Sequence, residues 1–231
     1  MWGSPERCRA LIFSYWRRVA HFPRDSHIAW RTSSWSGVKN LLPYGSVYRG
    51  GKLLVIEQDL ERVHSVSPPE DVEIELFDGD VSRLFSILPT ATREAFNARF
   101  AAGRSCLLAS RSSNVVGYTW LSPRIDSDIE FLPLALPDDA VYLWDLFVPR
   151  NERGGGIGSA LTGARLALAK QWGFRFGWRA VSPENKPSMR TVEKTGGSQV
   201  LGELSWYQLF GRSHAKEVRY GEKPILASRS E

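Results

Sequence analysis

A run of glycines lies where a buried strand would pass directly into a helix. Residues 141–148 are almost continuously apolar, as in a buried strand, and residues 157–171 carry apolar side chains at helical spacing. Between them stand Gly154 to Gly156, and Gly158 follows one residue into the helix. Since a glycine inside a helix costs roughly 1 kcal/mol relative to alanine, these positions must need to be free of side chains. The strand–turn–helix unit also predicts a neighbouring parallel strand.

The glycine run has the properties of a phosphate-binding turn. The first turn of a helix offers unpaired N–H groups and the positive end of the helix dipole, and Arg153 adds a further positive charge. A Walker A loop does not fit, because no lysine follows the glycines. A dinucleotide fingerprint does not fit either, because Ser159 or Leu161 stands where its third glycine would be. The pattern Arg-x-x-Gly-x-Gly is complete at residues 153–158.

Two further segments accompany this motif in order. Residues 185–188 read Asn-Lys-Pro-Ser, and residues 193–197 read Glu-Lys-Thr-Gly-Gly. Together with the strand at 142–148 and the motif at 153–158, they resemble the acyl-coenzyme A binding region of the GCN5-related N-acetyltransferase superfamily. The order of the predicted elements from Val72 onward is similar to that family's fold as well.

The resemblance implies an α/β fold with a central mixed, mostly antiparallel sheet flanked by helices. We expect residues 71–231 to form this acetyltransferase domain and residues 1–70 to form a basic N-terminal extension that ends in a linker at 64–70. From periodicity and turn residues we expect helices at 7–22, 78–88, 92–102, 157–171 and 186–194, and strands at 52–56, 72–76, 106–109, 115–121, 141–148, 174–181 and 199–210. Residues 112–114 predict a hairpin turn.

For function, the resemblance implies transfer of an acetyl group from acetyl-CoA to a primary amine, by direct attack on the thioester and without a metal. The diphosphate would bind the N–H groups of Arg153 to Ser159. The pantetheine arm would lie between two parting strands and bond to the backbone near Phe147 and Val148. The residues implied in cofactor binding are Phe147, Val148, Arg153, Gly154, Gly155, Gly156, Ile157, Gly158, Ser159, Asn185 and Ser188.

Asp145 is the strongest candidate for a catalytic base, because it is the only charged residue in an otherwise apolar strand and a protonated amine must lose a proton before it attacks. Alternatively, Asp145 orients a loop or attracts a cationic substrate. Many relatives carry a tyrosine seven residues after the asparagine, which protonates the departing thiolate, but Val192 stands here. Either the thiolate leaves unassisted, or Ser188 or Tyr207 serves as the acid, or the activity is altered.

Positive charge is concentrated in the first quarter of the chain. Residues 1–52 have a net charge of +7, against +5 for the whole chain. Such a segment suits an anionic lipid, a nucleic acid or an acidic partner, or is simply a solvated face. We expect no nucleic-acid binding, since no reader module is present, but weak membrane contact through residues 1–52 and a homodimer are open expectations.

Several features bear on location and on competing functions. The two cysteines are too few for a disulfide framework and no signal-peptide cleavage site is present, so we expect a cytoplasmic protein. No histidine pair has metal-ligand spacing. Competing functions are an acyl-CoA sensor of the same fold without turnover and an acyltransferase for longer acyl chains, with residues 1–70 covering the pocket. We expect the tryptophans on predicted strands to be core residues, or otherwise to line an acceptor pocket: Trp120, Trp144, Trp178 and Trp206.

Overall fold

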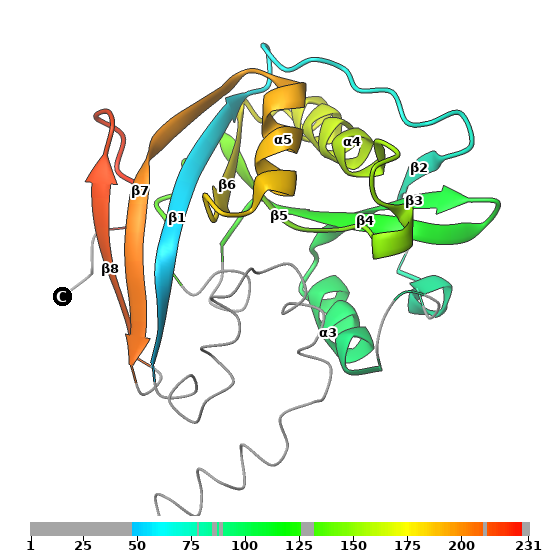
Figure 1. Cartoon of the computed structure of the whole chain (residues 1–231), viewed down its shortest axis with the longest axis horizontal. Helices are drawn as coiled ribbons and strands as arrows, with labels where there is room; N and C mark the ends of the chain where they lie inside the picture. The colour runs from blue at the N-terminus through cyan, green and yellow to red at the C-terminus, as the bar shows by residue number, and fades with distance from the viewer. Residues whose placement is uncertain are drawn as a thin grey trace, which may run out of the picture.

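The computed structural model describes residues 48–77, 79–84, 87, 90–125, 132–209 and 212–227. Within these residues, one eight-stranded sheet has the order β2-β3-β4-β5-β6-β1-β7-β8 (Figure 1). Its strands are β1 (Tyr48–Asp59), β2 (Glu73–Leu76), β3 (Ser105–Arg111), β4 (Asn114–Ser122), β5 (Ala140–Phe147), β6 (Phe176–Val181), β7 (Ser198–Leu209) and β8 (Arg212–Arg219). The predicted helix at 7–22 lies outside the described residues.

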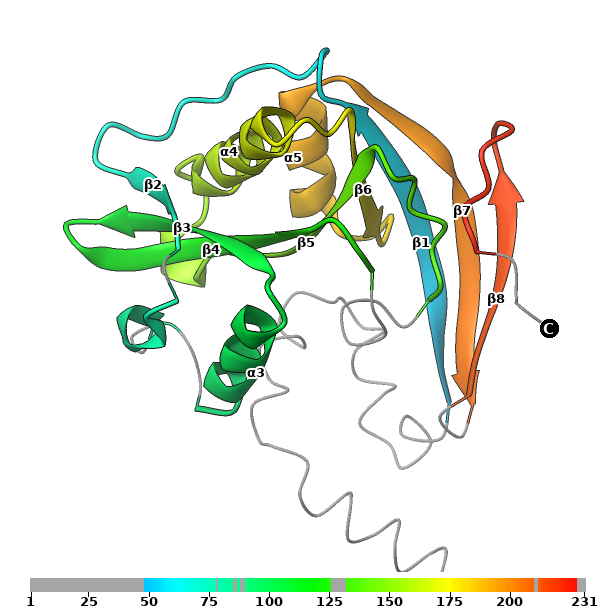
Figure 2. The ribbon, with the colours of Figure 1, turned by 180° about the vertical axis from the view of Figure 1, so that it is seen from behind.

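Helices cover both faces of this sheet. Two of them, α4 (Ile157–Gln171) and α5 (Lys186–Thr195), lie together on one face, and α3 (Thr90–Ala101) lies on the other (Figures 1 and 2). Two short 3-10 turns complete the description, η4 (Val81–Leu84) and η5 (Arg150–Glu152). Among the described residues, no helix combines the length and apolarity that crossing a membrane requires.

The sheet is mixed and mostly antiparallel, as expected. Only β5 and β6 pair in parallel, and α4 provides the crossover between them. The β3–β4 hairpin closes through Ser112 and Ser113, which both have positive φ, as a two-residue hairpin turn requires. The fold class predicted from the sequence is therefore confirmed.

Strand β1 is longer and more central than the sequence predicted. The prediction placed a short strand at 52–56 inside an N-terminal extension, but β1 has 12 residues and pairs with both β6 and β7. Its polar end, Glu57 and Gln58, resembles the edge of a strand in sequence. Both side chains are buried, at 1% and 0% exposure, and both are hydrogen-bonded. Residues 48–59 of the predicted extension therefore belong to the sheet.

Two other predictions were inaccurate. The helix expected at 78–88 is, in the described residues, only the 3-10 turn η4, and Asp80 accepts hydrogen bonds from the backbone and hydroxyl of Ser82 at its start. Such local side-chain bonds compete with helix formation. At the C-terminal end, β8 extends the sheet beyond the predicted strand at 199–210.

The tryptophans of the central strands belong to the core, as expected. Trp120, Trp144 and Trp178 are at most 9% exposed and pack in the main hydrophobic cluster, while Trp206 is half-buried against it. This cluster lies on the α3 face of the sheet. A second cluster, which contains Leu143 and Leu166, packs α4 onto the opposite face.

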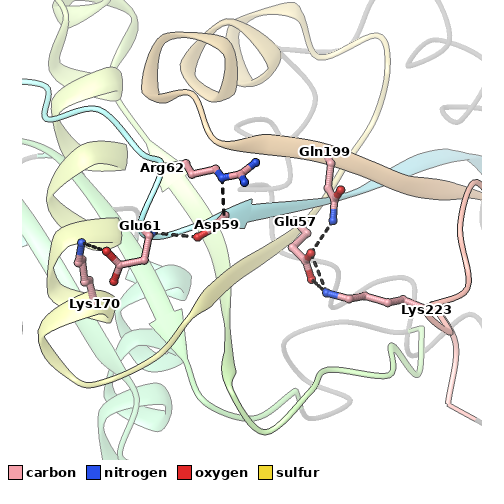
Figure 3. A network of polar contacts seen from close by, with 7 residues as sticks. All are labelled: Glu57, Asp59, Glu61, Arg62, Lys170, Gln199 and Lys223. Atoms are coloured by element: carbon pink, nitrogen blue, oxygen red, sulfur yellow. Dashed lines mark hydrogen bonds and ion pairs between the residues drawn. The ribbon is translucent and has the colours of Figure 1, made fainter.

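A buried carboxylate connects the end of the chain to the sheet. Glu57 accepts hydrogen bonds from Gln199 Nε2 at 2.7 Å and Lys223 Nζ at 2.7 Å (Figure 3). It also accepts one from Trp178 Nε1 at 2.8 Å. These donors compensate the charge of Glu57, because a buried charge without partners is strongly unfavourable. The neighbouring pairs Asp59–Arg62 and Glu61–Lys170 lie more in the open and contribute little (Figure 3).

Replacing Lys223 by methionine should therefore destabilise the fold by about 1–3 kcal/mol, because it removes the only cation beside the buried Glu57 carboxylate among the described residues. Urea unfolding measures the change. Lys216→Met, at an exposed lysine of β8, is the matched control and should be nearly neutral. Equal midpoints for the two variants would contradict the assignment.

Candidate functional site

Strands β5 and β6 part after a short parallel contact. Ala140–Tyr142 pair with Phe176–Trp178, and then the two strands continue without further pairing to each other, β5 to Phe147 and β6 to Val181. We call the facing segments Leu143–Phe147 and Arg179–Val181 the wedge. Backbone groups along a strand edge that has lost its partner are free to bind a ligand.

A bulge lies in the β5 side of the wedge. Trp144 and Phe147 pair with Trp120 and Tyr118 of β4, so β5 carries one residue more than its partner between these pairs. Asp145, within the bulge, has a φ of 44°. A left-handed residue other than glycine costs of order 1–3 kcal/mol and bulges re-aim nearby groups, so this conformation is typical of a functional position.

The Asp145 side chain lies toward α3 and forms an ion pair there. Its Oδ2 accepts a hydrogen bond from Arg99 Nη1 at 2.5 Å. The Arg99 guanidinium lies 4.5 Å from the centre of the Trp144 ring and 5.3 Å from that of Trp120. The predicted base is therefore held by a cation that lies among aromatic rings. No motif or spacing in the sequence marks Arg99 as part of the site.

The glycine run precedes α4 as an open turn. Gly154 and Gly156 have φ of 93° and 89°, and Gly156 is the N-cap residue of α4 without a side chain to cap the helix. A Cβ atom added at Gly154, Gly155 or Gly156 would meet no other atom within 4 Å. All three are exposed. Side chains here would project into the space that a ligand must enter to reach the helix N-terminus.

The two ends of the predicted phosphate turn already have hydrogen-bond partners. The Arg153 N–H bonds to the Arg150 carbonyl at 3.3 Å, and the Ser159 N–H bonds to the Gly156 carbonyl at 3.0 Å. The Arg153 side chain donates from Nε to the Val148 carbonyl at 2.8 Å. Within the described residues, this leaves the N–H groups of Gly154 to Gly158 without a backbone partner, as expected for the start of a helix.

The second cofactor segment forms the start of α5. Asn185 is the N-cap residue, and its Oδ1 accepts a hydrogen bond from the Ser188 N–H at 3.2 Å. Gly158 of α4 faces this helix closely, because an added Cβ would lie 3.8 Å from both Thr191 and Val148. The β5 end, the glycine turn and α5 therefore meet in one place, which brings together the residues predicted from the resemblance.

The missing tyrosine is not replaced by Tyr207, which lies away from the wedge, and the valine at position 192 has no acidic group. Val192 is 3% exposed and packs against Ile56 and Val181 in the core. Tyr207 pairs with Gly50 on β1, beyond the part of β1 that contacts β6, and stacks on His214 with ring centres 4.8 Å apart. Ser188, the other candidate, lies in the first turn of α5, within the second cofactor segment.

Two arginines that the sequence analysis did not select lie buried on the α4 face. Arg165 of α4 donates to Thr119 Oγ1 at 2.7 Å, and Arg179 of β6 donates to Gln58. Each is 2% exposed. No group of three metal-binding side chains occurs in the described part of the chain.

Comparison with known proteins agrees with this geometry. The profile of the Acetyltransferase (GNAT) family matches residues 74–197. The chain belongs to this family. None of the curated proteins matches it in sequence.

Solved structures share the GNAT fold at low sequence identity. A Drosophila protein is 15% identical with a TM-score of 0.54, over 76% of this chain and 57% of its own. A GNAT-family protein from Novosphingobium aromaticivorans is 14% identical with a TM-score of 0.50, over 72% of this chain and 68% of its own. A GCN5-related glucosamine N-acetyltransferase region of a fungal β-N-acetylglucosaminidase is 12% identical with a TM-score of 0.50, over 75% of this chain and 23% of its own. The chain thus spans little more than half of the first of these.

Cys106 is a buried free cysteine, and its thiol should be chemically inert. Burial, and secondarily the charge of Asp145, raises the pKa of the Cys106 thiol, so the reactive thiolate is scarce. In a Cys8→Ser background, we expect iodoacetamide to label the folded protein roughly 100-fold more slowly than the urea-unfolded protein at the same pH. Labelling of the folded protein at the unfolded rate would contradict this.

Proposed function

We propose that this GNAT protein transfers an acyl group from a coenzyme A thioester to a primary amine. The observation that carries the proposal is the open glycine turn beside the wedge. Free N–H groups at 154–158 begin α4, and no side chain obstructs them. Anions of the size and charge of a diphosphate bind such helix starts. Family membership supports acyl transfer in general.

The chain's own groups fit the parts of a coenzyme A thioester. The N–H groups of Gly154 to Gly158 would hold the diphosphate, and the unpaired β5 edge near Phe147 would bond to the amides of the pantetheine arm. The Val148 carbonyl already accepts a hydrogen bond from Arg153, which leaves its second lone pair and the Val148 N–H for the pantetheine arm. The thioester supplies an activated carbonyl carbon, and a backbone N–H of the bulge would stabilise the negative charge that forms on its oxygen.

The amine would approach from the α3 face, where Asp145 lies. An ammonium group competes there with Arg99 for the Asp145 carboxylate and for the faces of Trp144 and Trp120. After a proton passes from the ammonium group to Asp145 or to water, the amine nitrogen bonds to the thioester carbon. The carbon–sulfur bond then breaks, the sulfur leaves with the electron pair, and the nitrogen gives up its second proton to the thiolate or to water. A thiolate is a fair leaving group, so turnover does not require the missing tyrosine.

The ion pair of Asp145 favours one competing function, an acyl-CoA sensor without turnover. If Arg99 holds Asp145 permanently, no base remains at the wedge. Coenzyme A release that depends on an added amine decides against the sensor. Contact of residues 1–52 with an anionic membrane surface, transfer of longer acyl chains, a homodimer and a cytoplasmic location also stay predictions.

A glutamate at Gly155 should weaken binding of coenzyme A by about 10- to 100-fold, because its charge would lie beside the diphosphate. Gly155 does not have positive φ and has open space around it, so the fold should not change. Gly221→Glu, at a second glycine with open space, is the matched control. Isothermal titration calorimetry measures the affinity of each variant for coenzyme A. Equal affinity in the two variants would place the diphosphate elsewhere.

Asp145→Asn should lower amine-dependent coenzyme A release by about 10-fold or more, because it removes the carboxylate that lies at the bulge. Asparagine tolerates a left-handed backbone as aspartate does, so the bulge should persist. Affinity for coenzyme A should stay within about twofold of wild type. Unchanged release would assign Asp145 to structure alone.

A further inference from the structure

The strongest unexplained feature is a pair of buried arginines without carboxylates. Arg165 and Arg179 are each 2% exposed. Arg165 Nη1 donates to Thr119 Oγ1 and, at 3.5 Å, to the Trp144 carbonyl; Arg179 Nη2 donates to Gln58. Three buried side-chain nitrogen atoms have no hydrogen-bond partner in the described part of the chain: Nε of Arg165, and Nε and Nη1 of Arg179.

These two guanidinium groups lack compensating charge. Burial lowers the pKa of Arg179 to about 9 and that of Arg165 well below its ordinary value, and the charge of Arg179 contributes to the second shift. Tyr142 opposes both shifts, and no carboxylate contributes to either, while Asp145 is paired with Arg99 toward α3. Since arginine keeps its proton in proteins, two like charges lie in the core with unused donors. Such an arrangement is unfavourable for folding alone and fits an anionic ligand.

Both arginines lie at the closed end of the wedge. Arg179 directly follows Trp178, the last β6 residue that pairs with β5. Arg165 reaches the carbonyl of Trp144, which directly precedes Asp145 in the bulge. Both side chains belong to the side of the sheet covered by α4 and α5, since Gln58, the partner of Arg179, also bonds to Thr195 of α5. The glycine turn follows β5, at the open end of the wedge. A donor whose diphosphate lies at this turn and whose arm follows the β5 edge would therefore point its acyl end toward the closed end of the wedge.

We propose that the acyl donor is a dicarboxylic acid joined to coenzyme A through one carboxyl group, and that Arg165 and Arg179 bind the other carboxylate. This inference rests on the proposed function. Guanidinium groups match carboxylates in shape and charge. The unpaired N–H groups of Arg165 and Arg179 could donate to the two oxygens of the distal carboxylate. The acetyl group is uncharged and uses none of them. The reaction is otherwise unchanged: the amine nitrogen bonds to the thioester carbon, the sulfur leaves, and the distal carboxylate does not react.

The test compares succinyl-CoA with butyryl-CoA, which has the same chain length without the terminal charge. Calorimetry should show succinyl-CoA binding at least about 10-fold more tightly to wild type, and amine-dependent thiol release should show the same preference. Equal or tighter binding of butyryl-CoA overturns the inference. If neither thioester nor free coenzyme A binds, the proposed function itself has failed, which is a different result.

Substitutions of the two arginines test whether these residues cause the preference for succinyl-CoA. Arg179→Leu and Arg165→Leu should abolish the advantage of succinyl-CoA and leave butyryl-CoA affinity within about twofold, while Arg179→Lys retains part of the advantage. Arg62→Leu, at an exposed arginine, is the matched control. The leucine variants should melt at the wild-type temperature or above it, because a buried unpaired charge is removed. A succinyl-CoA preference that survives both leucine variants overturns the assignment of the carboxylate to these residues.

A further experiment distinguishes a binding site for the acyl carboxylate from a binding site for a free inorganic anion at the same two arginines. Chloride and free succinate are titrated against thermal unfolding of the wild-type protein. Stabilisation by chloride that is lost in Arg179→Leu, together with equal binding of the two thioesters, identifies an ion site and overturns the donor assignment. If the leucine variants do not fold, the wild-type comparison of the two thioesters still decides.

Discussion

The parting of two parallel strands after three paired residues determines where the other parts of the site lie. Once β5 leaves β6, its edge cannot satisfy its backbone groups within the sheet, and the crossover helix has to begin at the carboxyl ends of the same strands. The glycine turn therefore opens beside the wedge, and α5, which follows β6, begins next to it. A ligand that spans the turn and the wedge satisfies both sets of free backbone groups at once.

Several unfavourable features gather around this place. Asp145 has a left-handed backbone, adjacent exposed glycines precede a helix, and two arginines are buried without carboxylates. A fold tolerates such departures from local preference where a ligand or a reaction requires them. By contrast, the buried Glu57 is fully engaged by a lysine, an indole and an amide, as a carboxylate with a purely structural role should be.

Much of the fold could be predicted from residue patterns, because the strands around the glycine turn are apolar and the turn residues mark their ends. Hydropathy patterns did not predict the positions where polar residues are buried. Glu57 and Gln58 resemble a strand end but lie inside β1. The arginines were missed for the same reason, although the signals were present. Arg165 stands four residues after Leu161 on the buried face of α4, and Arg179 stands two residues before Val181 on one face of β6. Arg99 gave no such signal, because only the tertiary fold brings α3 to Asp145.

The most direct measurement of the central claim follows the backbone amides of the glycine turn by nuclear magnetic resonance. Coenzyme A should shift the amide signals of Gly154, Gly155, Gly156 and Gly158 and slow their hydrogen exchange, while pantetheine, which has no diphosphate, should leave them unchanged. A coenzyme A titration that moves other signals and not these, or a response to pantetheine of the same size, would contradict the account.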